Sequence, residues 1–174
     1  MRKLLFAFAA IALTAAPAGA ALKSGSKAPD FTTTGALAGK PFQFHLADAL
    51  KKGPVVLYFF PKAFTQGCTL EAKAFADAMP EFRKAGARVV GLSADNLDTL
   101  KKFSTEACRS KFPVATASPE TIKAYDVVLK QKPELTDRTS YVIDRKGRIV
   151  MVHSELDWKD HVARTLAAVQ ALKG

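Results

Sequence analysis

The chain is poor in the residues that most often hold transition metals. Its 174 residues include two cysteines, Cys68 and Cys108, and three histidines. Phe42, Phe44 and Leu46 alternate with polar residues, which predicts a half-exposed strand, and His45 in this strand has no second ligand near it at metal spacing. Nothing in the sequence requires a metal or an organic cofactor.

Acidic residues are also scarce, at 16 against 26 lysines and arginines, so the formal net charge is +10. The basic residues stand in short groups far apart in the sequence. No long basic run and no motif with interleaved aromatic residues accompanies them, and we therefore expect a solvated basic surface and no nucleic-acid partner.

The chain has no apolar run long enough to span a bilayer. Its longest, LLFAFAAIALTAA, follows Met1-Arg2-Lys3 and precedes Ala18-Gly19-Ala20, which together form the charged, apolar and small-residue regions of a secretory signal peptide. The rival interpretation is an uncleaved membrane anchor. We expect residues 1–20 to be a signal peptide, with cleavage after Ala20, export to the bacterial periplasm and no stable membrane association. Residues 21–174 are then the size of a single domain that can bury a core without disulfide bonds.

The most informative stretch joins a predicted strand to a predicted helix. Val55–Phe60 is a β-branched and aromatic run typical of a strand buried on both faces, and Pro61 ends it. From Thr69 the sequence changes to helix formers. Cys68 therefore lies at the start of a helix, where unpaired backbone N–H groups and the helix dipole stabilise a thiolate. The alternative is a small buried thiol that happens to fall at this junction.

The residues around Cys68 carry a family resemblance. Pro61, Thr65 and Cys68 have the spacing P-x-x-x-T-x-x-C, which resembles the active-site motif of peroxiredoxins, and PKAFTQGCTLEA is similar to the bacterioferritin comigratory protein subgroup. Gln66 replaces the proline usual in the family, which changes loop rigidity and removes no chemical group. The resemblance implies that Cys68 is the peroxidatic nucleophile, that the Thr65 hydroxyl orients the peroxide and that Pro61 shields the site.

A second stretch resembles the same family. Arg138-Thr139-Ser140-Tyr141-Val142-Ile143-Asp144 is similar to the family's R-x-T/S-F-x-I-D strand, whose arginine reaches the active site. Beside Cys68, the permanent charge of Arg138 would favour the thiolate and hold a peroxide oxygen. Glu71 follows Cys68 by three residues and either pairs with Arg138 or complements the helix dipole.

The remaining pattern predicts an α/β protein with a thioredoxin-like fold, in which helices flank a central mixed sheet in a single domain. Ala28-Pro29-Asp30-Phe31 resembles the entry segment of peroxiredoxins. Further strands are expected at residues 89–93, 112–115, 139–144 and 148–153, and further helices at 97–108, 118–125 and 157–173. The strand, helix, strand order around Cys68 predicts parallel strands and a right-handed crossover. We expect Pro80 to interrupt the helix that follows Cys68 and Gly86 to end it.

The sequence leaves two routes open for the thiol that reacts with oxidised Cys68. Many subgroup members place a resolving cysteine five residues after the peroxidatic one, but this chain has Lys73 there, and Cys108 falls in the region used by a second set of members. The resemblance therefore implies an intramolecular Cys68–Cys108 disulfide and reduction by a thioredoxin-like or glutaredoxin-like donor. The substrates implied are hydrogen peroxide and organic hydroperoxides, and the protein is expected to be a monomer or weak dimer. In a one-cysteine alternative, Cys108 is structural and an outside thiol reduces Cys68.

Other classes fit the sequence less well. A disulfide reductase of the same fold needs C-x-x-C, and Glu71 stands at its second cysteine. A copper-delivery module needs C-x-x-x-C, and Ala72 stands there. The remaining alternative is an exported binding or structural module in which Cys68 and Cys108 form a permanent disulfide.

Overall fold

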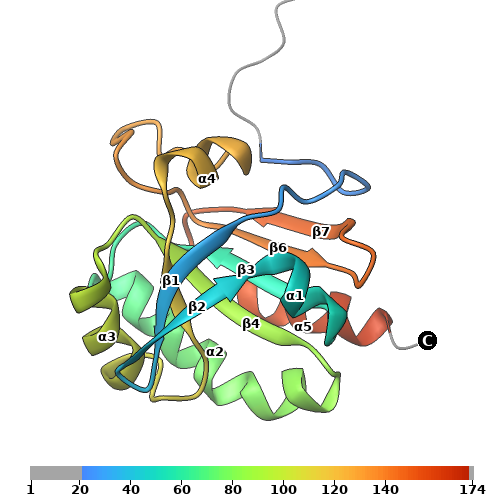
Figure 1. Cartoon of the computed structure of the whole chain (residues 1–174), viewed down its shortest axis with the longest axis horizontal. Helices are drawn as coiled ribbons and strands as arrows, with labels where there is room; N and C mark the ends of the chain where they lie inside the picture. Colours follow the sequence, from blue (N-terminus) through green and yellow to red (C-terminus); the bar gives the residue numbers. More distant parts are fainter. Residues whose placement is uncertain (1–20, 173–174) are drawn as a thin grey trace, which may run out of the picture.

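The computed structural model of the chain describes residues 21–172 (Figure 1). The expected signal peptide, residues 1–20, lies outside the described residues. The strands are β1 (Thr32–Leu37), β2 (Lys40–His45), β3 (Val55–Phe59), β4 (Arg88–Ser93), β5 (Val114–Thr116), β6 (Thr139–Ile143) and β7 (Ile149–Ser154). The helices are α1 (Leu46–Lys51), α2 (Gln66–Lys84), α3 (Leu97–Glu106), α4 (Pro119–Ala124) and α5 (His161–Ala171). None of the helices in this part of the chain has the length and apolar character needed to cross a membrane.

The seven strands form one mixed sheet in the order β2-β1-β5-β4-β3-β6-β7. At its centre, β3 runs parallel to β4 and antiparallel to β6. The strands that flank the Cys68 helix, β3 and β4, were predicted to be parallel, and this is confirmed. Parallel neighbours need a crossover that returns the chain to the same end of the sheet, and α2 provides it.

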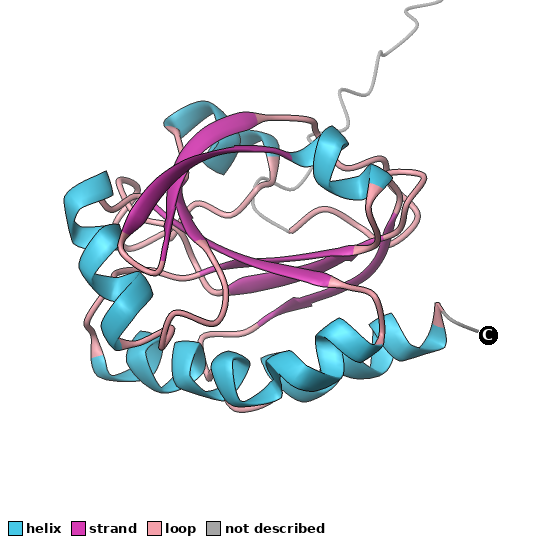
Figure 2. Ribbon diagram, turned by 60° about the horizontal axis from the view of Figure 1, so that its bottom comes forward, coloured by secondary structure: helices cyan, strands magenta, loops and turns pink. Residues whose placement is uncertain are grey.

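Helices cover both faces of the sheet (Figures 1 and 2). One hydrophobic cluster joins α2, α3 and α5 to Val56 and Tyr58 of β3, and a second joins α1 and α4 to Val55, Leu57 and Phe59. Successive side chains of β3 thus enter opposite clusters, which explains its unbroken apolar sequence. The expected mixed sheet flanked by helices is confirmed, and so is the strand buried on both faces.

Several local predictions differ from the structure. Helix α2 is continuous through Pro80, so the expected interruption is wrong, whereas Gly86, with φ of 75°, follows the end of the helix as expected. An internal proline costs about 3 kcal/mol, and burial of Phe75, Met79 and Phe82 on the same helix offsets this cost. Helix α2 also begins three residues earlier than expected, at Gln66.

Strand β1 and helix α1 were not predicted from the sequence. Strand β1 lacks alternating polarity and is held by its antiparallel pairing to β2 and β5. Leu46 was expected to continue the preceding strand, but it begins helix α1. The Asp30 carboxylate accepts a hydrogen bond from the Ala47 N–H and so stabilises the start of this helix. A long-range partner of this kind cannot be read from local sequence.

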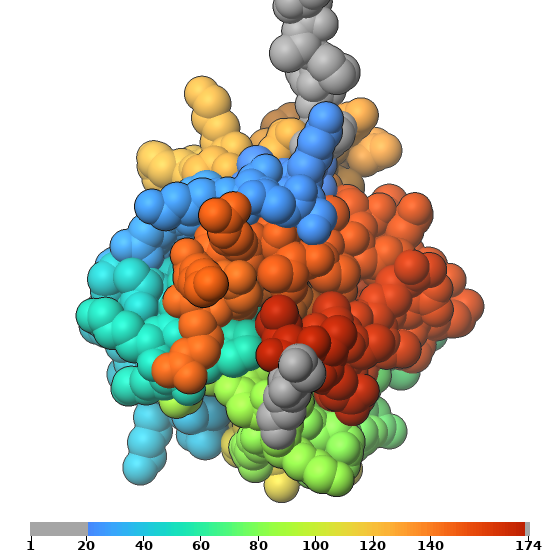
Figure 3. Space-filling model, turned by 90° about the vertical axis from the view of Figure 1, so that its right-hand side faces the viewer, coloured from blue at the N-terminus to red at the C-terminus, as the bar shows by residue number. Residues whose placement is uncertain are grey.

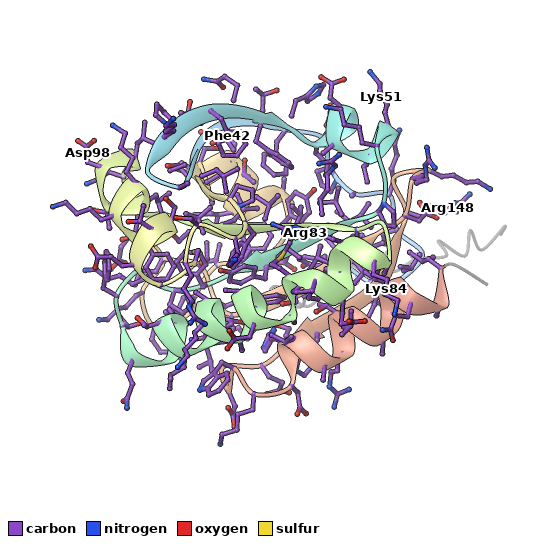
Figure 4. All side chains as sticks on the ribbon, turned by 90° about the horizontal axis from the view of Figure 1, so that it is seen from below. Phe42, Lys51, Arg83, Lys84, Asp98 and Arg148 are labelled. Carbon is purple, nitrogen blue, oxygen red and sulfur yellow. The ribbon has the colours of Figure 1, made fainter. Side chains whose placement is uncertain are left out.

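The charged surface matches the scattered pattern of the sequence. Lys51 of α1, Asp98 of α3 and Arg148, just before β7, lie at separate places around the molecule (Figure 4). Several lysines are paired locally, for example Lys51 with Asp48 and Lys101 with Asp98, both at exposed positions. Exposed pairs of this type contribute little stability.

Two buried tyrosines offer a matched test of what a hydroxyl hydrogen bond contributes to stability. The Tyr58 hydroxyl has no hydrogen-bond partner among the described residues, whereas the Tyr125 hydroxyl donates to the Pro29 carbonyl at 2.7 Å. Tyr125→Phe should lower the free energy of unfolding by about 1 kcal/mol because it leaves the partly buried Pro29 carbonyl without its hydrogen-bond donor. Tyr58→Phe should leave it unchanged or raise it by up to about 1 kcal/mol. Urea unfolding of both variants tests this, and an equal loss in the two would show that Tyr58 is hydrogen-bonded in solution.

Candidate active site

Cys68 is the third residue of α2 and is 1% exposed. The helix begins directly after β3 and a short loop, so the thiol lies at the carboxyl end of a central strand, where open α/β sheets place their sites. The first N–H groups of a helix have no acceptor within it, and here they belong to Gln66, Gly67 and Cys68. Both the dipole and these donors favour negative charge at the sulfur.

Arg138 reaches Cys68 from the neighbouring strand. It directly precedes β6, whose register places Thr139 opposite Phe59 at the end of β3. Its Nη2 donates to the Cys68 Sγ at 3.4 Å, and its Nε donates to the Leu156 carbonyl at 2.9 Å. A side-chain carbon at Gly67 would lie 3.2 Å from the same Nη2, so glycine there allows the guanidinium its close approach. The structure therefore brings Arg138 and Cys68 together as the sequence predicted.

Glu71 completes this cluster from the next turn of α2. Its side chain is fully buried, its Oε2 accepts a hydrogen bond from Arg138 Nη1, and its Oε1 has no hydrogen-bond partner among the described residues. Burial raises the pKa of Glu71 to about 8, and Arg138 opposes this rise. Burial also acts to lower the pKa of Arg138, but the attraction of Glu71 and Cys68 exceeds it, and that pKa is raised. Of the two roles expected for Glu71, the geometry places it in the pairing position.

Thr65 and Pro61 flank the thiol in the preceding loop. Thr65 is the N-cap residue of α2, and its hydroxyl donates to the Lys62 carbonyl at 3.0 Å. This hydroxyl is not hydrogen-bonded to Cys68. Pro61 is half-buried and lies two residues after the end of β3. The Ala63 N–H donates to the carboxylate of Asp95 at 2.7 Å, which ties this loop to the segment that follows β4.

Cys108 lies in the segment after α3 and is fully buried. Both cysteines are free thiols and belong to the same hydrophobic cluster. Burial raises the pKa of Cys108 well above its ordinary value, so this thiol is not a nucleophile where it stands. The next two residues, Arg109 and Ser110, have left-handed backbone angles with φ of 51° and 57°, a conformation that costs energy in residues other than glycine.

Sequence reasoning missed a histidine beside the cluster. His161, in the first turn of α5, is fully buried, with its Nδ1 2.8 Å from the Ser140 hydroxyl and its Nε2 2.9 Å from the Glu155 carbonyl. Its Nδ1 also lies 3.8 Å from Glu71 Oε1. The one available signal was its spacing, because His161 precedes the buried Thr165 and Val169 by four and eight residues on one helix face.

The site contains no recognisable metal centre. Among residues 21–172, no three His, Cys, Asp or Glu side chains are grouped so that they could hold a metal ion. The chemistry available at the site is that of a thiol beside a guanidinium and a helix N-terminus, which suits nucleophilic attack by sulfur.

Comparison with known proteins assigns the family. A sequence model of the AhpC/TSA family matches residues 24–152, which is most of the chain. The chain belongs to the AhpC/TSA family. Within it the chain is a peroxiredoxin of the bacterioferritin comigratory protein-like subgroup, a thiol peroxidase, as the resemblance around Cys68 and Arg138 implied.

Individual relatives agree with this assignment. The chloroplastic peroxiredoxin Q of Sedum lineare is 35% identical over 158 residues, covering 88% of this chain and 81% of the relative. The crystal structure of peroxidoxin BcpB from Mycobacterium tuberculosis has a TM-score of 0.77 and 33% identity, covering 88% of this chain and 99% of that one. The reduced 2-Cys peroxiredoxin of Plasmodium vivax has a TM-score of 0.76 at 20% identity, covering 86% of this chain and 96% of that one, which shows a shared fold alone. The predicted thioredoxin-like fold is confirmed, and the alternative of a module with a permanent Cys68–Cys108 disulfide has no support in this peroxiredoxin.

Proposed function

We propose that this peroxiredoxin reduces hydrogen peroxide and organic hydroperoxides with Cys68 as the peroxidatic nucleophile. The observation that supports this most strongly is the 3.4 Å contact between Arg138 Nη2 and the Cys68 Sγ. A fixed cation and a helix N-terminus meet at one sulfur, and both favour the thiolate, which is the reactive form.

The proposed first step is attack of the Cys68 thiolate on the terminal oxygen of the hydroperoxide. An S–O bond forms as the O–O bond breaks, the leaving oxygen takes a proton, and the products are a sulfenic acid and water or an alcohol. Arg138 and the backbone N–H groups of Gly67 and Cys68 stabilise the charge that passes to the leaving oxygen. The Thr65 hydroxyl already donates to Lys62, so its oxygen is left to accept the peroxide O–H. Pro61 limits the access of bulk water.

The proposed second step is resolution by Cys108, whose thiol attacks the sulfenic acid to give a disulfide and water. A disulfide needs Cα atoms within about 7 Å, and Cys108 is fully buried, so the segment after α3 must open locally first. The left-handed backbone at Arg109 and Ser110 favours this segment as the one that opens. A thioredoxin-like or glutaredoxin-like donor then reduces the disulfide, and the enzyme acts in antioxidant defence as a monomer or weak dimer.

Thiol mapping tests the resolving step. After one equivalent of hydrogen peroxide and denaturing alkylation, the reduced chain should lose both alkylation sites without gaining dimer mass. Cys108→Ser should consume one equivalent of peroxide and then stop without an external thiol. If Cys108 is still alkylated when Cys68 is oxidised, the enzyme uses the one-cysteine route; if neither thiol changes, Cys68 is not the peroxidatic residue.

We also propose that the protein is exported to the periplasm. The support is the charged, apolar and small-residue pattern of residues 1–20. The chain isolated from the periplasm should begin at Ala21 in N-terminal sequencing. Recovery of a chain that begins at Met1 would contradict cleavage.

A further inference from the structure

The segment that carries Cys108 is anchored in the core on both sides and is largely exposed between the anchors. Phe103, in α3, is fully buried and Phe112 is 1% exposed, and each packs against an aromatic ring at the end of β3. Within residues 107–111 the buried side chains are those of Ala107 and Cys108. Opening of this segment therefore takes two small side chains out of the core, which costs little buried apolar area.

The backbone of the segment is strained when it is closed. Arg109 and Ser110 both have left-handed angles, with φ of 51° and 57°. Residues other than glycine keep this conformation only where surrounding contacts hold them in it. Backbone hydrogen bonds supply part of that hold, since the Cys108 N–H donates to the Phe103 carbonyl at 3.1 Å and the Ser110 N–H to the Ser104 carbonyl at 2.9 Å.

Two side chains of α2, the helix of Cys68, supply further contacts. The Asp77 carboxylate accepts a hydrogen bond from Arg109 Nη1 at 2.5 Å, and Arg83 Nη2 donates to the Lys111 carbonyl at 2.8 Å. We call these two contacts the α2 clasp. All four residues are exposed. Figure 3 shows the C-terminal part of α2 (light green) at the surface of the molecule, below α5 (red).

The α2 clasp holds the segment far along the helix from Cys68. An α-helix rises 1.5 Å per residue, so Asp77 and Arg83 lie about 14 Å and about 22 Å from Cys68 along its axis. The Lys111 N–H donates to the Cys108 carbonyl at 2.9 Å, so the turn that contains Cys108 moves with the clasped residue. A disulfide needs the two Cα atoms within about 7 Å, and the segment must leave the later turns of α2 to reach that distance.

The contacts of the clasp thus oppose the movement that the resolving step requires. We propose that Asp77 and Arg83 are positioning residues for this step. They hold residues 107–111 closed against α2 and so set how often the Cys108 thiol is free to react. In the step itself the S–S bond forms, the S–O bond of the Cys68 sulfenic acid breaks, and the hydroxyl leaves with the thiol proton as water. This inference rests on the proposed function in taking Cys108 as the resolving thiol.

Loss of either clasp contact should speed disulfide formation. Asp77→Asn and Arg83→Met should each raise its rate about twofold to fivefold, the range for one exposed charged contact. The double variant should raise it about tenfold, because both contacts stabilise the closed state alone. Asp77→Glu keeps the charge and should return the rate toward that of the wild type. Ser110→Gly should act in the opposite direction and slow the step, because glycine adopts the left-handed conformation without strain.

The first measurement follows opening without peroxide, as the rate at which an alkylating reagent labels Cys108 in the reduced Cys68→Ser chain. A buried thiol reacts when its segment opens, so the labelling rate reports the open population. Labelling should accelerate in the two clasp variants and slow in Ser110→Gly. Salt raised from about 0.05 M to about 0.5 M should accelerate labelling when Asp77 is present and have less effect in Asp77→Asn, because salt screens exposed pairs.

The matched control is Asp98→Asn, which breaks the exposed pair with Lys101 on α3. It should leave the labelling rate unchanged, because this pair lies outside residues 107–111. Equal acceleration in Asp98→Asn, or unchanged labelling in the double clasp variant, would overturn the inference.

The second measurement follows the disulfide itself in chains that keep both cysteines. Reduced chains are mixed with one equivalent of hydrogen peroxide, quenched with acid at intervals and assayed for the disulfide by mass. The clasp variants should form it faster while their first reaction with peroxide is unchanged, since both residues lie on later turns of α2, away from the Cys68 thiol. Faster labelling of Cys108 with an unchanged rate of disulfide formation would overturn the inference. Labelling that responds as expected in a chain that never forms the disulfide would instead refute the proposed resolving step and leave the clasp standing.

Discussion

Cys68→Ser should lose essentially all peroxide consumption, a fall of about ten-thousandfold or more in the second-order rate constant. A serine hydroxyl does not ionise at neutral pH, so the attacking anion is gone while Arg138 and the helix N-terminus remain. The substitution nearly conserves side-chain volume at a site that is 1% exposed, and the fold should persist. The measurement is peroxide loss with a chemical thiol as the reductant.

The matched control is Cys108→Ser, which changes the other buried thiol of the same cluster. It should keep the fast first reaction with peroxide, since Cys108 acts only after Cys68 has been oxidised. Undiminished peroxide turnover in Cys68→Ser would refute the assignment of the nucleophile. Loss of the first reaction in Cys108→Ser would exchange the roles of the two cysteines.

Arg138→Met should lower the rate constant for peroxide by about a hundredfold to a thousandfold, the range for losing one preorganised donor to developing charge. It should also lower the free energy of unfolding by about 2 kcal/mol, because a buried carboxyl loses a charged hydrogen-bond partner. The stability loss should grow as pH rises past about 8, where the wild-type Glu71 ionises. Without Arg138 the folded-state pKa of Glu71 rises further. Above about pH 8 the folded variant therefore still binds a proton that the folded wild type and the unfolded chain have released, and its stability falls with rising pH.

The double variant Arg138→Met/Glu71→Gln separates the two effects. It has no ionisable group at position 71, so the pH dependence of the stability loss should disappear while the peroxidase defect remains. Stopped-flow kinetics and urea unfolding at pH 6 and pH 9 measure both quantities. Equal pH dependence in the single and double variants would contradict the placement of the titrating group at Glu71.

The junction between β3 and α2 could be predicted from the sequence because its signals are local. An unbroken apolar strand, a proline and a change to helix formers locate the start of the Cys68 helix to within three residues. The antiparallel register of β3 and β6 brings Arg138 to the same end of the sheet. Pro80 misled the prediction, because the proline penalty is local whereas the packing of Phe75 and Phe82 that outweighs it is tertiary.

The part of the site beyond Arg138 could not be predicted in this way. The environment of His161 depends on Ser140 in β6 and on Glu71 in α2, which lie 21 and 90 residues away along the chain. Neither spacing forms a motif. The depth of Cys108 is likewise a property of the packed cluster, so the sequence indicated a second thiol but not the local opening that its use requires.

Trapping of the oxidised sulfur tests the central claim most directly. Reduced Cys108→Ser would be mixed with one equivalent of hydrogen peroxide in the presence of dimedone, and the adduct located by peptide mass. One adduct per chain on Cys68 is expected, formed at the rate at which peroxide disappears. Peroxide loss with no adduct or higher oxide on Cys68 would contradict the claim that this thiol is the peroxidatic nucleophile.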